Sequence, residues 1–196
     1  NPSGNNADDC VLVSGISITD RNGCIDSDSD GYSDPDDSWT TANGADSCIN
    51  ALGNSTSDRN GCLDGDGDGF SDPDGSWNIA NGADAYPTDK SQWADQDDDG
   101  FGDNPSGTNG DNCPSTTGTS YIDRNGCTDT DGDNYSDPGF GWTIADGADA
   151  FQSDPLRWLD TDGDGLDDFI DDDCPNHAGT SSLDRNGCPD IDGDGY

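Results

Sequence analysis

Residues 58–77 read DRNGCLDGDGDGFSDPDGSW, a stretch that holds six carboxylates in twenty residues. Near-copies of it begin at Asp20, Asp123 and Asp184. Each copy joins a DRNGC segment, which ends in a cysteine, to an Asp-rich loop. Self-similarity on this scale indicates a repeat array, in which each unit contacts mainly its neighbours.

The composition excludes a conventional hydrophobic core. Leu, Ile, Val and Phe supply 23 of 196 residues, about 12%, and the net charge is −38. A chain below about 20% of these residues with so high a charge is expected to stay open unless disulfides or metals hold it together. All 44 acidic residues are Asp and none is Glu, which favours ligand supply over a generic acidic surface.

The eight cysteines form four pairs, each 14 residues apart, and the second member of each pair ends a DRNGC segment. This even count and fixed spacing predict disulfides rather than zinc ligands. The predicted pairs are Cys10–Cys24, Cys48–Cys62, Cys113–Cys127 and Cys174–Cys188. Four such disulfides favour an extracellular or cell-surface location.

The whole chain, 1–196, is predicted to be one continuous array with units at 10–47, 48–112, 113–173 and 174–196. The segment NPSGNNADDC at 1–10 aligns with NPSGTNGDNC at 104–113, and the C-terminal DIDGDGY resembles the start of another Asp loop. We therefore expect a fragment of a longer array. No stretch approaches the about 20 apolar residues of a membrane span.

The motif D-x-D-x-D-G-x-x-D places carboxylates at positions 1, 3, 5 and 9 of a tight loop and a backbone carbonyl at position 7. These oxygens suit calcium, which takes about 6–8 oxygen ligands; magnesium ranks second, because it retains more waters. Five full copies and a partial sixth predict at least five to six calcium sites. Their ligands are Asp26, Asp28, Asp30, Tyr32 and Asp34, with Asp37 at position 12; Asp64, Asp66, Asp68, Phe70 and Asp72; Asp95, Asp97, Asp99, Phe101 and Asp103; Asp129, Asp131, Asp133, Tyr135 and Asp137; Asp160, Asp162, Asp164, Leu166 and Asp168, with Asp171 at position 12; and Asp190, Asp192 and Asp194.

Two other segments are candidates for additional ligands. In DRNGC the candidates are Asp20, Asn22, Asp58, Asn60, Asp123, Asn125, Asp184 and Asn186. The alternative reading of this segment is an Asn-Gly turn whose Arg pairs with a nearby Asp, and both can hold together. In the ANGAD-type segments the candidates are Asp46, Asp84 and Asp149.

Periodicity predicts almost no regular secondary structure, and VLVSGISI at 11–18 is the best strand candidate. The helices that flank an EF-hand loop are absent from the pattern, because Pro follows the loops and Cys or Trp precedes them. The fold class is therefore an irregular, loop-rich array stabilised by calcium and disulfides, elongated into a rod or fibre.

The D-x-D-x-D-G loops, the sequence Asp168, Asp171, Asp173-Cys174-Pro175 and the loop disulfides together resemble thrombospondin type 3 repeats. The resemblance covers nearly the whole chain. It implies a fold with little secondary structure whose backbone wraps closely spaced calcium ions. The ANGAD and DRNGC segments depart from the vertebrate pattern and are more similar to related arrays in microbial surface proteins.

Trp39, Trp77, Trp93, Trp142 and Trp158 recur beside the loops, and we expect each to cover a small apolar cluster; stacking on carbohydrate is the alternative. Two N-glycosylation sequons begin at Asn54 and Asn134. Asn54 is the glycosylation candidate, because Asn134 lies inside an ion loop.

These features predict an extracellular structural protein, a rod or filament stiffened by calcium. The alternative is a calcium-dependent adhesin stalk or docking module. The expected partners are calcium, further copies or repeats of the chain in a fibre, and glycans; so acidic a chain is not expected to bind nucleic acid. We expect no enzyme, because His177 is the sole histidine and Lys90 the sole lysine, and no nucleophile motif or cofactor fingerprint occurs.

Overall fold

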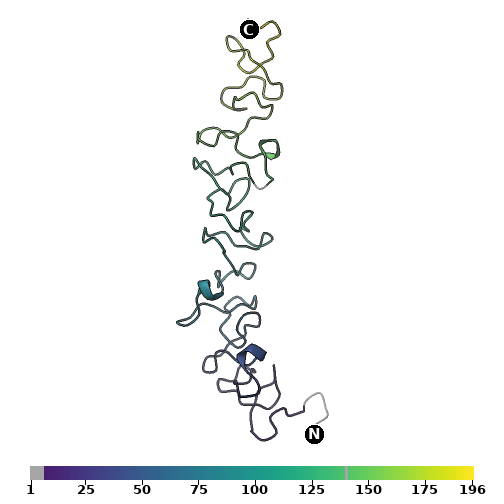
Figure 1. Cartoon of the computed structure of the whole chain (residues 1–196), viewed down its shortest axis with the longest axis vertical. Helices are drawn as coiled ribbons and strands as arrows, with labels where there is room; N and C mark the ends of the chain where they lie inside the picture. Colours follow the sequence, from purple (N-terminus) through teal and green to yellow (C-terminus); the bar gives the residue numbers. More distant parts are fainter. Residues whose placement is uncertain (1–6, 140) are drawn as a thin grey trace. The chain divides into compact units, whose positions relative to one another are not determined.

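The computed structural model describes residues 7–139 and 141–196. Within these ranges the regular secondary structure is three single-turn 3₁₀ helices, η1 (Thr41–Asn43), η2 (Ile79–Asn81) and η3 (Ile144–Asp146). Turns and bends make up the remainder, as the tube trace of Figure 1 shows. The prediction of an irregular, loop-rich fold is confirmed. None of the helices in the described ranges is long or apolar enough to cross a membrane.

The chain forms two compact units. The first comprises the chain up to Ala94 together with Gly102–Thr108, and the second comprises Asp95–Phe101 and Asn109–Tyr196. Each unit contains two of the four disulfides. The finer division into four repeat units stays a prediction.

Four disulfides join the predicted cysteine pairs, and each closes a loop with a sequence separation of 14: Cys10–Cys24, Cys48–Cys62, Cys113–Cys127 and Cys174–Cys188. All four loops share the pattern C-x4-G-x-S-x2-D-R-N-G-C. The shared serine is buried. In the first loop the Ser17 hydroxyl donates to the Arg21 carbonyl at 2.6 Å and accepts the Cys24 N–H at 2.9 Å. The hydroxyl adds to the backbone bonds across the loop, such as that from the Gly23 N–H to the Ser17 carbonyl at 2.9 Å.

The shared glycine of the disulfide loop is required by close backbone packing. A Cβ on Gly118 would lie 2.1 Å from the carbonyl carbon and oxygen of Cys127, well inside van der Waals contact. The corresponding distances at Gly15, Gly53 and Gly179 are equally short. The two halves of each disulfide loop therefore touch backbone to backbone.

Each Asp loop is shaped by its own first carboxylate. In the second loop, Asp64 Oδ1 accepts the Gly67 N–H at 2.6 Å and Asp64 Oδ2 accepts the Gly69 N–H at 2.9 Å. The turn needs a positive φ at position 6, where Gly69 has φ 104° and Asn134, in the fourth loop, has φ 80°. Asn is one of the few side chains that enter this region readily, so the loop tolerates the substitution.

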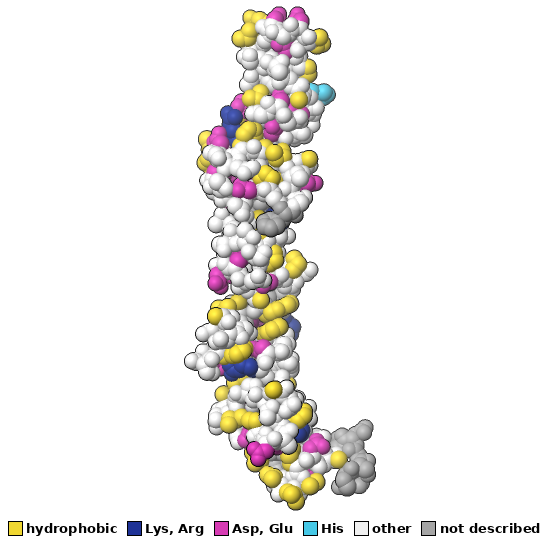
Figure 2. Space-filling model, in the orientation of Figure 1, with side chains coloured by type: hydrophobic (Ala, Val, Ile, Leu, Met, Phe, Trp, Pro, Cys, Tyr) yellow, Lys and Arg dark blue, Asp and Glu magenta, His cyan; other side chains and the backbone are white. Residues whose placement is uncertain are grey.

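The interior of the described residues is small and polar. The buried apolar side chains are Tyr32, three alanines (Ala45, Ala83 and Ala148) and five of the eight cysteines (Cys24, Cys62, Cys113, Cys127 and Cys188). Buried serines and aspartates outnumber them. Large apolar side chains lie at the surface instead, and Figure 2 shows them spread over the visible face. Hydrogen bonds and disulfides therefore hold the fold in place of an apolar core.

The strand predicted at 11–18 is wrong. The Ser17 N–H bonds to the Cys24 carbonyl at 3.2 Å, whereas the N–H groups of Ile18 and Thr19 both reach the Gly31 carbonyl at 2.9 Å, so no ladder forms. Ile16 and Ile18 are 61% and 76% exposed, and the buried residue between them is Ser17. Exposed and buried residues do alternate at 16–18, but the buried one is polar, because hydrogen bonds hold this interior.

The tryptophans have two kinds of environment. Trp93 stacks on Phe70 with ring centroids 5.4 Å apart, and Trp158 stacks on Tyr135 at 5.1 Å. These pairs match the predicted small apolar clusters. Trp39, Trp77 and Trp142 instead each lie under an arginine guanidinium from the DRNGC segment, at 5.4–5.7 Å.

Candidate metal sites

The Asp loops bring carboxylates together in threes. In each of five loops, one oxygen from each of positions 1, 3 and 5 lies within 4.8 Å of the other two, which is close enough for a single cation to contact all three. The five triplets are Asp26, Asp28 and Asp30; Asp64, Asp66 and Asp68; Asp95, Asp97 and Asp99; Asp129, Asp131 and Asp133; and Asp160, Asp162 and Asp164. The chain therefore holds repeated carboxylate clusters that are positioned to bind metal ions.

Positions 5, 7 and 9 add to this geometry. In the second loop the Phe70 N–H donates to Asp68 Oδ1 at 2.8 Å, which fixes the turn that carries the Phe70 carbonyl. Asp72, at position 9, accepts the Gly65 N–H at 3.0 Å and so folds back over the loop. The corresponding N–H bonds recur at Tyr32, Phe101, Tyr135 and Leu166. As ligands, these carbonyls and the position 9 carboxylates stay predictions.

A further carboxylate approaches each of several clusters from the segment that follows. Asp46 and Asp84 are completely buried and Asp149 is 1% exposed. Their burial raises their pKa, and the aspartates of the preceding loop raise it further: Asp30, Asp28 and Asp34 act on Asp46, and matching residues act on Asp84 and Asp149. The pKa rises to about 7 for Asp46 and to about 6 for Asp84 and Asp149. All three candidates from the ANGAD-type segments therefore lie against an Asp loop.

This carboxylate is held in the same way in each case. Its Oδ1 atom accepts the N–H of the residue two positions later, at 2.7 Å from Cys48, Tyr86 and Phe151. The other oxygen, Oδ2, is buried without a hydrogen-bond partner in Asp46 and Asp84. A buried carboxylate oxygen that lacks a donor costs free energy, and a cation removes that cost.

Sequence reasoning missed two members of this set, Asp111 and Asp172. Both have the same hydrogen bond as Asp46: Asp111 Oδ1 accepts the Cys113 N–H at 2.6 Å, and Asp172 Oδ1 accepts the Cys174 N–H at 2.7 Å. Burial and the charges of Asp164, Asp162 and Asp168 raise the pKa of Asp172. The signal was in the sequence: an Asp stands two positions before the first cysteine of every pair, at Asp8, Asp46, Asp111 and Asp172.

The glycine of DRNGC lies against the Asp that stands two positions before the first cysteine of the pair, and a larger residue would collide with it. Gly61 has φ 73°, and a Cβ there would lie 2.4 Å from Asp46 Oδ1 and 2.9 Å from Asp30 Oδ2. Gly126 and Gly187 face Asp111 and Asp172 in the same way. The glycine therefore leaves room for two carboxylates to converge.

Unsatisfied carboxylate oxygens gather in the loops as well. Buried oxygens without a partner occur on Asp66, Asp68, Asp97, Asp131, Asp133 and Asp162, which occupy position 3 or 5. Native interiors rarely leave buried polar atoms unpaired. The donor set is oxygen throughout, with no sulfur or imidazole in the triplets, so these residues fit a hard cation.

The aspartates of DRNGC have hydrogen-bond partners within the fold. Asp20 accepts the Ser33 N–H at 2.8 Å, the Ser33 hydroxyl at 2.6 Å and the Trp39 Nε1–H at 2.9 Å. Asp58 makes the same three bonds with Ser71 and Trp77, and Asp123 makes the two with Ser136. Asp184 accepts the Ser181 hydroxyl at 3.1 Å. The contacts of Asp20, Asp58 and Asp123 join the disulfide loop to the Asp loop, whereas that of Asp184 lies within the disulfide loop.

The asparagines and arginines of DRNGC also have partners. Asn60, Asn125 and Asn186 each donate from Nδ2 to a backbone carbonyl 15 or 16 residues earlier, and the Asn22 N–H bonds to Asp9 Oδ2. Arg21 and Arg59 form ion pairs with Asp36 and Asp74, both at 2.8 Å. These contacts favour the turn-and-ion-pair reading of the segment; as metal ligands, its Asp and Asn residues stay predictions.

The two position 12 candidates differ from the rest. Asp37 is exposed. Asp171 accepts the Asp167 N–H at 2.7 Å and pairs with Arg157 at 2.6 Å, whereas its neighbour Asp172 carries the buried, unpartnered oxygen. In the fifth loop the geometry thus favours Asp172 over Asp171 as the additional ligand.

The third and sixth Asp loops are the remaining candidate metal sites. Asp103 belongs to the first unit and Asp95, Asp97, Asp99 and Phe101 to the second, so the triplet is described without Asp103. In the sixth loop, Asp190 accepts the N–H groups of Gly193 and Gly195 at 2.8 and 2.7 Å, the bonds that position 1 makes in a complete loop. Asp192 and Asp194 follow at positions 3 and 5 and remain predicted ligands. At the glycosylation candidate, the Asn54 side chain is exposed.

No protein-family model matches the sequence, and no curated protein matches it either.

Proposed function

We propose that this chain is an extracellular structural protein whose Asp loops bind several calcium ions and are stiffened by them into a rod or filament. The observation that carries the proposal is the row of buried carboxylate oxygens without hydrogen-bond donors, above all Asp46 Oδ2 and Asp84 Oδ2, each beside an Asp triplet. The triplets contain no basic side chain, and the second loop has one nearby, Lys90, whose ammonium donates to the Gly67 carbonyl. A divalent cation supplies the positive charge that such a cluster of carboxylates needs.

Calcium is the ion that best suits these sites. A triplet, a position 9 carboxylate, a position 7 carbonyl and the buried carboxylate amount to six oxygen donors, which is the lower end of the calcium range. Magnesium is the second candidate. At a calcium concentration ten times the dissociation constant, each site stabilises the folded chain by about 1.4 kcal/mol, so five such sites together contribute about 7 kcal/mol.

The rod is supported by hydrogen bonds that tie an Asp loop to the disulfide loop after it. Asp30 Oδ2 accepts the Gly53 N–H at 3.3 Å, Asp99 Oδ2 accepts the Gly118 N–H at 2.9 Å, and Asp164 Oδ2 accepts the Gly179 N–H at 3.1 Å. A cation that orders such a loop also orders the next one. Repetition of this link is a route to stiffness over many units.

The class of protein follows from the same features. The Asp triplets and disulfide pairs are compatible with a calcium-binding repeat, and thrombospondin type 3 repeats are the family that the sequence resembles. Four disulfides favour an oxidising, extracellular setting. In this proposal the chain has no enzymatic activity, and its partners are calcium, further repeats or copies of itself, and glycans at sites such as Asn54.

Small-angle X-ray scattering of the disulfide-intact protein in 2 mM calcium and in excess EGTA tests the proposal. We expect a constant cross-section and a long maximum dimension in calcium, and a broader, flexible distribution after chelation. Identical scattering curves in the two buffers would contradict both the metal sites and their structural role.

The alternative is a calcium-dependent adhesin stalk or docking module. The exposed side chains of Val11, Leu12, Ile16 and Ile18 in the first disulfide loop favour it, because exposed apolar groups serve contacts with other molecules. A stalk shares the calcium sites, so the two functions differ in whether the isolated chain assembles or binds a separate ligand.

A further inference from the structure

The three copies that contain a DRNGC segment, an Asp loop and a Trp differ at three positions between the position 9 carboxylate and the Trp, and one of these supplies the carboxylate partner of the DRNGC arginine. Two residues after the position 9 carboxylate, the first copy has Asp36 and the second has Asp74, whereas the third has Gly139. The N–H of this residue bonds to the carbonyl of the Trp in all three copies, at 2.7 Å in the first two and at 2.9 Å in the third. The third copy therefore lacks the carboxylate but keeps this backbone hydrogen bond.

In the first two copies this carboxylate neutralises the arginine of DRNGC. Arg21 NH1 lies 2.8 Å from Asp36 Oδ2, and both terminal nitrogens of Arg59 lie 2.8 Å from Asp74 Oδ2. Hydrogen bonds from Ser38 and from Arg21 lower the pKa of Asp36, so the pair is ionised at any ordinary pH. A guanidinium paired with a carboxylate is thus the normal state of this place in the repeat.

In the third copy the guanidinium has no such partner. Arg124 NH2 donates to the Asn112 carbonyl at 3.2 Å and to Cys113 Sγ at 3.3 Å, and the Trp142 ring lies 5.7 Å from its Cζ. No carboxylate within residues 7–139 and 141–196 forms an ion pair with it. Arg185, the corresponding arginine of the partial fourth copy, also forms no ion pair in the described ranges and donates to Cys174 Sγ at 3.2 Å. Arg124 is thus the DRNGC arginine that has a complete Asp loop beside it and no carboxylate partner.

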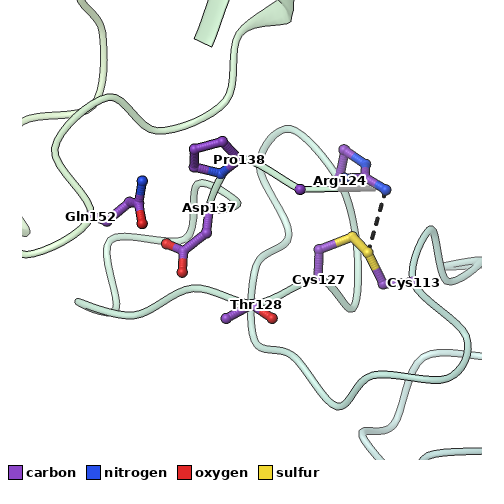
Figure 3. Close-up of a pocket in the computed structure, with 8 residues that line it drawn as sticks. Cys113, Arg124, Cys127, Thr128, Asp137, Pro138 and Gln152 are labelled. Atoms are coloured by element: carbon purple, nitrogen blue, oxygen red, sulfur yellow. Dashed lines mark hydrogen bonds between the residues drawn. A yellow bond between two sulfur atoms is a disulfide. The ribbon is translucent and has the colours of Figure 1, made fainter. Parts of the chain in front are cut away.

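A cavity of about 150 Å³ opens at this arginine. Figure 3 shows Arg124 and the Cys113–Cys127 disulfide on one side of it, Gln152 on the other and Pro138 between them. The first copy has a cavity of about 120 Å³ at the matching place, and Asp36 lines it. Since a water molecule occupies about 30 Å³ of liquid, the cavity of the third copy has room for a carboxylate group and part of its stem.

We propose that this cavity, here called the Arg124 pocket and lined by Arg124, Thr128, Gly139 and Gln152, binds a carboxylate from outside the chain. The ion pairs of Arg21 and Arg59 show the binding mode within the molecule, since an external carboxylate takes the place that Asp36 and Asp74 fill in the other copies. The planar guanidinium selects a carboxylate by its fork of donors. The Thr128 hydroxyl and the Gln152 amide line the cavity around the stem of the ligand.

The one opposing charge in the pocket is Asp137, the position 9 carboxylate of the fourth Asp loop. Its Oδ2 accepts the Thr130 hydroxyl at 2.5 Å and its Oδ1 accepts the Thr130 N–H at 3.3 Å. No calcium ion is needed for a carboxylate to bind Arg124, but calcium is present in the test so that the fourth Asp loop keeps its fold.

The test follows the side-chain Nε–Hε signals of the five arginines by NMR in 2 mM free calcium, during titration with acetate at constant ionic strength. We expect the Arg124 signal to shift saturably while those of Arg21 and Arg59 stay in place. A second titration uses a blocked aspartyl dipeptide. A response to acetate indicates a site for small carboxylates; a response to the peptide alone indicates that the ligand is an acidic side chain of a partner. No shift with either probe, or equal shifts of all arginines, would overturn the proposal.

Two matched variants make the result independent of any one mutant. Gly139→Asp restores the internal carboxylate, and we expect at least about tenfold weaker binding at Arg124, equivalent to about 1.4 kcal/mol. Asp36→Gly removes the carboxylate from the first copy, and we expect Arg21 to gain the response that Arg124 has in the natural chain. Unchanged binding in Gly139→Asp contradicts the proposal, and so does an Arg21 that stays silent in folded Asp36→Gly.

Discussion

Asp46 Oδ1 accepts the backbone N–H of Cys48 at 2.7 Å, so a completely buried carboxylate is anchored directly at a disulfide. Its other oxygen has no donor, and the aspartates of the first Asp loop raise the pKa of this carboxyl further. The backbone at the disulfide therefore orients the carboxylate that we propose as an additional ligand of the first cluster.

Replacing this carboxylate tests its role as a ligand. We expect Asp46→Asn to weaken calcium binding at the first loop by at least about tenfold, because one charged donor is lost from the cluster. Asp98→Asn is the control, since Asp98 is an exposed aspartate that belongs to none of the predicted ligand sets. Calorimetric titration of the apo chain measures both. Equal losses in the two variants would count against Asp46 as a ligand.

The pH dependence of stability should have opposite signs with and without calcium. Burial raises the pKa of Asp46 to about 7 and those of Asp84 and Asp149 to about 6, above the value of about 4 in an unfolded chain. Without calcium these groups favour folding while they are protonated, so their contribution to stability is greatest below pH 4 and is lost as the pH rises through 6 to 7.

In saturating calcium the trend reverses, because the ion binds the deprotonated carboxylates and acid releases it. Near-UV circular dichroism at pH 4.5 and pH 8, on calcium-saturated protein and on protein freed of calcium by a chelating resin, measures how the folded fraction changes with pH in each buffer. Parallel trends in the two buffers would show that these carboxylates do not meet a cation.

The backbone contact inside each disulfide loop predicts a sharp difference between two glycines. We expect Gly118→Ala to destabilise the fold by about 3 kcal/mol or more, because its Cβ would lie 2.1 Å from the Cys127 carbonyl and the disulfide prevents the loop from opening. Gly75→Ala should change stability by less than about 0.5 kcal/mol, since no atom lies within 4 Å of its Cβ. Urea unfolding in calcium compares them; similar stabilities would contradict the close packing.

The tryptophans offer an internal comparison of one hydrogen bond. The Nε1–H of Trp77 donates to Asp58 Oδ2 at 3.1 Å, whereas the Nε1 atom of Trp142 is buried without a partner. We expect Trp77→Phe to cost about 1–2 kcal/mol more than Trp142→Phe, because only the first loses a bond to a charged acceptor. Thermal unfolding of the two variants in calcium gives the difference. A larger cost for Trp142→Phe would be inconsistent with this geometry.

The features that local sequence controls were predictable. The spacing of the cysteines identified the four disulfides, and the D-x-D-x-D-G pattern identified the loops whose carboxylates cluster. Both depend on residues within about 15 positions of one another, and the geometry of each is set by its own turn residues, such as Gly69 and Asn134.

What required the structure depends on segments further apart. The position of Asp172 beside the fifth loop was missed because its neighbour Asp171 stands at position 12 of the motif. The structure distinguishes the two, because Asp171 pairs with Arg157 whereas Asp172 has a buried oxygen without a donor. The strand prediction at 11–18 failed for a related reason: in a chain without an apolar core, Ser17 is the residue that turns inward. The usual link between apolar patterning and burial does not hold here.

The most direct test of the account is native mass spectrometry of the disulfide-intact chain in 2 mM calcium, with circular dichroism of the same samples before and after EGTA. The account predicts at least five bound calcium ions, one for each Asp triplet, and loss of the folded signal as they are removed. A chain that carries no calcium, or one that keeps its fold when every ion has gone, would contradict the claim that cations balance its buried carboxylates.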